Sequence, residues 1–102
     1  MAATISGNVG NSFSGVVVTL YGQSSNGVVQ TTATSDSSGN YSFTPAAGKY
    51  VLQALPTTVS SQLYKYYTGH NVTVQASDVT GNTTFTVNFS PTAANAANTP
   101  TF

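Results

Sequence analysis

The chain has 102 residues, a formal net charge of zero and 4% charged residues, which are Lys49, Lys65, Asp36 and Asp78. This length fits one domain with one hydrophobic core. Because nucleic-acid binding needs clustered positive charge, two lysines without arginine argue against a nucleic-acid partner.

Two further classes of protein are excluded by composition. The chain has no cysteine, so it has neither a disulfide framework nor thiolate chemistry. Its longest aliphatic run, Val16–Val18, is far shorter than a membrane span, so we expect no membrane insertion. Disorder is also disfavoured, since 11% of the residues are aromatic and apolar residues alternate regularly.

The predicted elements are short strands in chain order. Apolar residues alternate with polar ones over 4–9 and 15–20, and in the second strand we expect Val16, Val18 and Leu20 to face inward. Residues 22–27 are predicted to form a loop, because Asn26-Gly27 is a turn signal. A third strand is predicted over 28–35.

The stretch Thr32–Phe43 predicts a β-hairpin. Two alternating segments flank a turn in which Asp36 can accept backbone N–H groups and Gly39 can adopt a positive φ. Tyr41 and Phe43 then serve as aromatic anchors on one face of the second strand. We take this hairpin as the element around which the rest of the chain packs.

The second half of the chain continues the alternation. Strands are predicted over 49–54, 71–75 and 83–89, with a turn at 76–78 and a long connection at 57–69 that contains a short strand or turn. No helical pattern separates the strands, and all four prolines lie outside them. The predicted fold is therefore an all-β sandwich over residues 1–89.

Residues 90–102 form an extended tail rich in Ala, Asn, Thr and Pro. This composition is typical of a linker to a neighbouring domain. The alternative is a segment donated as a strand to another copy, with Phe102 as an anchor.

Titratable residues predict no catalytic, metal or cofactor site. A nucleophilic triad would need His70 beside an acid and a serine, and paired-carboxylate chemistry would need Asp36 beside Asp78. Both aspartates are better explained as turn caps. The loop over 36–40 has only one carboxylate, too few for calcium.

Six aromatic residues are candidate contacts with a ligand or another subunit. Tyr64, Tyr66 and Tyr67 surround Lys65, and this cluster has three interpretations: packing on the core, a subunit contact or carbohydrate stacking. The candidate contacts are Tyr64, Tyr66, Tyr67, Tyr21, Phe13 and Phe102.

The order and spacing of the strand motifs resemble a known family. The segments that carry the resemblance are Ile5–Val9, Gly15–Leu20, Thr34–Phe43, Gly48–Leu52, Val72–Val74 and Asp78–Gly81. Over about residues 4–89 the chain is similar to carboxypeptidase regulatory-like domains and to the B-repeat domains of Gram-positive surface adhesins. The resemblance implies a seven-stranded antiparallel, prealbumin-like (Ig-like) sandwich that works outside the cell as a stalk, spacer or adhesive repeat.

One property of some adhesin relatives does not transfer. They carry an intramolecular Lys–Asn isopeptide bond that is catalysed by a buried acid. Here the first strand has no lysine and the chain has no glutamate.

We therefore expect a non-catalytic extracellular module without a cofactor, used as a cell-surface stalk or fibre subunit. Its expected partners are other copies or neighbouring domains, reached by β-strand addition of a terminal segment. The alternative is a carbohydrate-binding or adhesive module that uses surface tyrosines.

Overall fold

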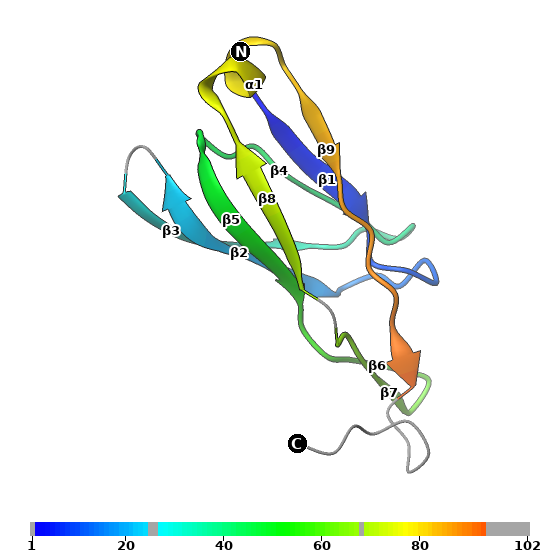
Figure 1. Ribbon diagram of the computed structural model, residues 1–102. Helices are drawn as coiled ribbons and strands as arrows, with labels where there is room; N and C mark the ends of the chain where they lie inside the picture. Colours follow the sequence, from blue (N-terminus) through cyan, green and yellow to red (C-terminus); the bar gives the residue numbers. More distant parts are fainter. Residues whose placement is uncertain (1, 25–26, 68, 94–102) are drawn as a thin grey trace.

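The computed structural model describes residues 2–24, 27–67 and 69–93, and its chain is built almost entirely of strands (Figure 1). The described elements are β1 (Thr4–Asn8), β2 (Val17–Ser24), β3 (Gly27–Thr34), β4 (Asn40–Phe43), β5 (Gly48–Ala54), β6 (Thr57–Val59), β7 (Gln62–Lys65), β8 (His70–Val74), α1 (Ala76–Thr80), β9 (Thr84–Thr86) and β10 (Thr92–Ala93). The predicted all-β class is confirmed.

The strands form two larger sheets and one small one. One sheet has the order β4-β1-β9, a second has β3-β2-β5-β8, and the small sheet has β10-β7-β6. The two larger sheets face each other, while the small sheet extends the molecule at one end (Figure 1). This layering is compatible with a β-sandwich.

The expected antiparallel pairing holds for every described pair except one. β1 and β9 run parallel, with Ile5 opposite Phe85. The reason is topological: the chain passes from one sheet to the other through α1 and enters β9 in the direction of β1.

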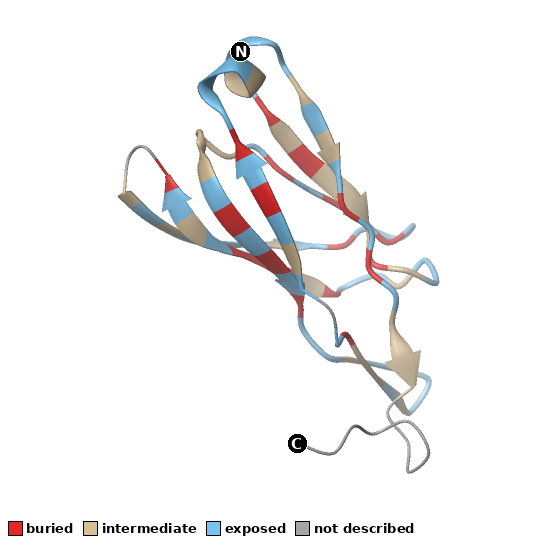
Figure 2. Cartoon of the chain, viewed as in Figure 1, coloured by how far each residue is buried: buried red, intermediate tan, exposed pale blue. Residues whose placement is uncertain are grey.

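A single core lies between the two larger sheets. Alternate residues of the strands in these two sheets point into it, as Figure 2 shows for β5 and β8. The inward orientation expected for Val16, Val18 and Leu20 is confirmed, since each is at most 1% exposed. The buried core residues are Ala3, Ile5, Val9, Val16, Val18, Leu20, Tyr41, Phe43, Tyr50, Leu52, Ala54, Tyr66, Val72, Val74, Val87 and Phe89.

The hairpin predicted over Thr32–Phe43 is wrong. β3 pairs with β2 and β4 pairs with β1, so the two strands belong to different sheets. The turn between them has the predicted chemistry, because Asp36 Oδ1 accepts the N–H groups of Ser38 and Asn40 at 2.9 Å and Gly39 has a φ of 84°. A tight turn here carries the chain across the core instead of reversing it within one sheet.

Other boundaries also differ from the predictions, and the last strand, expected over 83–89, is the shorter β9 (Thr84–Thr86). The loop expected over 22–27 is strand up to Ser24 and again from Gly27, and residues 25–26 lie outside the described residues. The turn expected at 76–78 is the five-residue helix α1. The connection expected at 57–69 contains the β6–β7 hairpin, whose turn residues Ser60 and Ser61 both have positive φ.

The first residues of the tail pair with a strand of the domain. Thr92 and Ala93 form β10, which pairs antiparallel with Lys65 and Tyr64 of β7. The remaining tail, 94–102, lies outside the described residues, and so does Phe102.

Candidate interaction surfaces

Tyr66 is part of the core. It is 6% exposed, its hydroxyl donates a hydrogen bond to the Val9 carbonyl at 2.6 Å, and its ring meets Phe89 edge-on. Burial raises the pKa of Tyr66 to about 12. A residue enclosed in this way cannot touch a ligand, so we remove it from the candidate contacts.

Tyr64 and Phe13 contact each other. Their ring centroids are 4.8 Å apart, and both residues are half-buried. This contact joins β7 to the loop that precedes β2. It corresponds to the packing interpretation of the tyrosine cluster.

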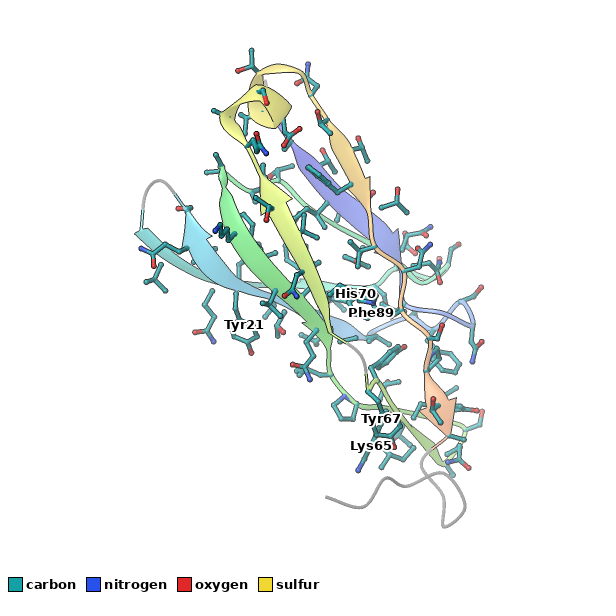
Figure 3. All side chains as sticks on the ribbon, viewed as in Figure 1. Tyr21, Lys65, Tyr67, His70 and Phe89 are labelled. Carbon is teal, nitrogen blue, oxygen red and sulfur yellow. The ribbon has the colours of Figure 1, made fainter. Side chains whose placement is uncertain are left out.

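Tyr67 and Tyr21 are the exposed members of the predicted set, with 41% and 40% of their surface accessible. They come from separate regions: Tyr67 follows β7, while Tyr21 lies on β2 (Figure 3). Because these rings are not neighbours, the described tyrosines do not form one aromatic platform of the kind that stacks on a sugar.

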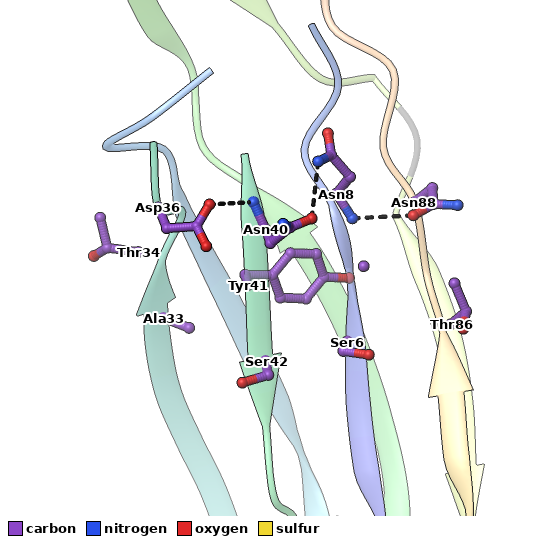
Figure 4. Close-up of a pocket in the computed structure, with 11 residues that line it drawn as sticks. Ser6, Asn8, Ala33, Thr34, Asp36, Asn40, Tyr41, Ser42, Thr86 and Asn88 are labelled. Carbon is purple, nitrogen blue, oxygen red and sulfur yellow. Dashed lines mark hydrogen bonds between the residues drawn. The ribbon is translucent and has the colours of Figure 1, made fainter. Parts of the chain in front are cut away.

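A shallow groove of about 630 Å³ crosses the sheet β4-β1-β9 (Figure 4). We call it the polar groove. Two rows of side chains lie across the sheet there, and they are Ser42, Ser6 and Thr86, then Asn40, Asn8 and Asn88, of which Asn88 follows the end of β9. These positions were not predicted, although polar residues two apart in each strand signalled an exposed sheet face.

The amides and the carboxylate of the polar groove are largely engaged with one another (Figure 4). Asn8 Nδ2 donates to Asn40 Oδ1 at 3.0 Å and to the Ser38 carbonyl at 2.8 Å. Asn88 Oδ1 accepts the backbone N–H of Asn8 at 3.0 Å, and so stands in for a carbonyl of the β1–β9 ladder. These contacts hold the turn and strands together, and the groove presents mainly neutral hydroxyls to solvent.

The titratable side chains are dispersed over the molecule. Hydrogen bonds from the N–H groups of Asn40 and Ser38 keep the pKa of Asp36 below its ordinary value. Asp78 accepts the Gln75 N–H at the start of α1, whereas His70 packs edge-on against Phe89 at the other end of β8. Within residues 2–24, 27–67 and 69–93, no three His, Cys, Asp or Glu side chains gather as metal ligands.

Two other grooves lie where edge strands of the two sheets face each other. One, of about 460 Å³, lies between β3 and β4 and is lined by Leu20, Val29, Phe43 and Tyr50 among others. The second, of about 470 Å³, lies between β8 and β9. Both expose backbone edges beside apolar side chains.

No helix in the described part of the chain is both long and apolar enough to span a membrane. Comparison with known proteins adds no family assignment: no protein-family model matches the chain, and no curated protein is significantly similar to it.

Proposed function

We propose that this protein is a non-catalytic structural module, used outside the cell as a stalk domain or fibre subunit. The observation that carries the proposal is the use of its polar groups. Asp36 and Asp78 cap backbone N–H groups, and the hydroxyls of Tyr41, Tyr50 and Tyr66 donate to backbone carbonyls. In an enzyme such carboxylates and hydroxyls would act on a substrate, whereas in this protein they stabilise the fold.

The proposal includes a prealbumin-like arrangement. Seven of the described strands lie in the two facing sheets, β4-β1-β9 and β3-β2-β5-β8, and the hairpin β6–β7 with β10 is an addition at one end. The strand motifs that resemble carboxypeptidase regulatory-like and adhesin B-repeat domains support the same arrangement. In that family, such modules act outside the cell as spacers or adhesive repeats.

The location is tested with antibodies against the chain. Intact cells of the source organism should be labelled as strongly as lysed cells, whereas an antibody against a cytosolic protein labels only lysed cells. Labelling of the chain only after lysis would overturn the extracellular assignment.

The assembly part of the proposal is tested by deleting residues 90–102. Assembly by a donated terminal segment requires the truncated chain to remain folded and to lose association into species larger than a dimer in light scattering. Unchanged association would mean that the donor lies elsewhere. Because β10 pairs with β7, a truncation after Ala93 serves as the control that keeps this contact.

A second candidate function, glycan binding, rests on Tyr21. Its ring is 40% exposed on the outer face of β2, and the cross-strand row that contains it runs Gln30, Tyr21, Val51, Asn71. An aromatic ring beside the Gln30 amide suits a sugar, which offers both a C–H face and hydroxyls. Titration with a glycan panel should show binding that Tyr21→Ala abolishes and Tyr67→Ala preserves.

A further inference from the structure

We infer that the edge of β3 binds a second copy of this chain by antiparallel β3–β3 pairing. The inference rests on the proposed structural role and deepens it by naming the surface that makes the contact. The inference requires that the edge of β3 is open, that there is a reason for it to be covered, and that two copies of β3 can pair in a register that matches their N–H and C=O groups.

β3 is the longest edge strand that the structure describes. It has eight residues, against five in β8, four in β4 and three in β9. Natural proteins protect such edges with charged side chains, proline or shortness. Its sequence, GVVQTTAT, contains no charged residue and no proline.

Among the described residues, no strand pairs with the free side of β3, where the backbone groups of four of its residues point. The N–H and C=O groups of Ser35 both point to the β2 side, toward Val16 and Gly15. Because backbone groups alternate along a strand, those of every second residue before Ser35 also point to β2. The N–H and C=O groups that point away belong to Val28, Gln30, Thr32 and Thr34.

The β4 edge is blocked by its own turn. Asn40 has its free side toward β3, where its carbonyl accepts the backbone N–H of Asp36 and its own N–H donates to Asp36 Oδ1. A partner therefore finds fewer open groups there than on β3.

The inner side of β3 also lacks a full cover. The facing sheet has only three strands, its edge strand β4 has four residues against the eight of β3, and the hairpin β2–β3 projects away from β1 and β9 (Figure 1). Thr31 is exposed although it faces inward, and it lines the groove with Val29 and Phe43. A second strand added to β3 would extend the sheet and narrow this groove.

Only one register uses every open group. With Thr31 on a two-fold axis, Gln30 lies opposite Thr32 of the second copy, and Val28 lies opposite its Thr34. All four outward N–H groups of each copy then meet a carbonyl. On the inner side Val29 meets the small Ala33, and no charged residue is brought near another because β3 has none.

The first test measures register by cross-linking, since the chain has no cysteine of its own. In the inferred dimer the two Thr31 residues form a non-hydrogen-bonded pair with Cα atoms about 4.5 Å apart, within disulfide range. Thr31→Cys should therefore form a disulfide dimer rapidly under mild oxidation. Gln30→Cys is the control, because its copies are diagonal neighbours about 7–8 Å apart.

The second test measures affinity by sedimentation velocity over a concentration series of the full chain. Thr32→Pro removes an outward N–H group in each copy and should raise the dissociation constant about 30-fold. Thr86→Pro is the matched control: Thr86 is an exposed threonine on edge strand β9, and its N–H points away from β1 because that of Val87 donates to Ser6. The control should leave the dimer unchanged, and circular dichroism checks that both variants fold.

Three results would overturn the inference. They are a wild-type chain that stays monomeric up to about 1 mM, equal weakening by the two proline variants, and cross-linking of Thr31→Cys no faster than that of Gln30→Cys. A monomeric wild-type chain would not contradict the extracellular structural role, since that role is tested by labelling of intact cells. Labelling only of lysed cells would leave the β3 contact standing.

Discussion

Tyr66→Phe probes how the core uses a polar group. At neutral pH the variant loses the hydrogen bond from the Tyr66 hydroxyl to the Val9 carbonyl, which is 2.6 Å long and buried. A buried carbonyl left without its donor costs about 1–2 kcal/mol. We therefore expect the free energy of unfolding of the variant to be lower than that of the wild type by this amount.

The difference should disappear at high pH. Burial raises the pKa of Tyr66 from 10.0 to about 12, so its contribution is complete below the unfolded value and is lost as the pH rises toward the folded value. Two pKa units correspond to about 2.7 kcal/mol, which is of the same order as the cost of the lost hydrogen bond, so the two effects nearly cancel at high pH. Phenylalanine has no proton to lose, so the variant escapes this loss.

Urea unfolding of both proteins at intervals from about pH 8 to pH 12 measures the difference directly. Burial also raises the pKa of Tyr41, but this residue is common to both proteins, so its effect cancels in the difference. A difference that stays constant or grows with pH would refute the assignment of the neutral Tyr66 hydroxyl to the core.

Three further changes test separate contacts. Gly7→Ala should destabilise by about 1–3 kcal/mol in urea unfolding, since a Cβ there would overlap the Val87 carbonyl oxygen. Asp36→Asn should lower the melting temperature near neutral pH, and this effect should shrink as the solution is acidified, because the lowered pKa of Asp36 makes its contribution present above the unfolded value and lost as the pH falls through the folded value. Asn88→Ala should cost about 1 kcal/mol in urea unfolding, because the N–H of Asn8 loses its acceptor.

Controls separate these effects from general instability. Gly69→Ala places a Cβ 3.4 Å from the Leu52 carbonyl oxygen, so a cost equal to that of Gly7→Ala would contradict the close approach of β1 and β9. An Asp36→Asn effect that persists unchanged in acid would contradict the role of the carboxylate. For Asn88→Ala, a stability equal to the wild type would show that water replaces the amide oxygen.

Sequence reasoning placed the candidate contacts only in part. Tyr66 and Tyr67 are neighbours in sequence, yet one is buried and the other is 41% exposed. Composition cannot separate them, because both rings are amphipathic and the local strand ends before them. The polar groove was missed for a related reason: its rows join β4, β1 and β9, and periodicity does not reveal which strands are neighbours.

The sequence by itself determined the all-β class, the inward face of the second strand and the turn chemistry of Asp36 and Gly39, since alternation and φ preference are local properties. Only the tertiary structure decided which strands pair. Thr32–Phe43 has every local feature of a hairpin. Tyr41 and Phe43 nevertheless lie on the sheet opposite β3, because both rings are buried there. Pairing follows the burial of apolar surface between distant segments, which no local pattern records.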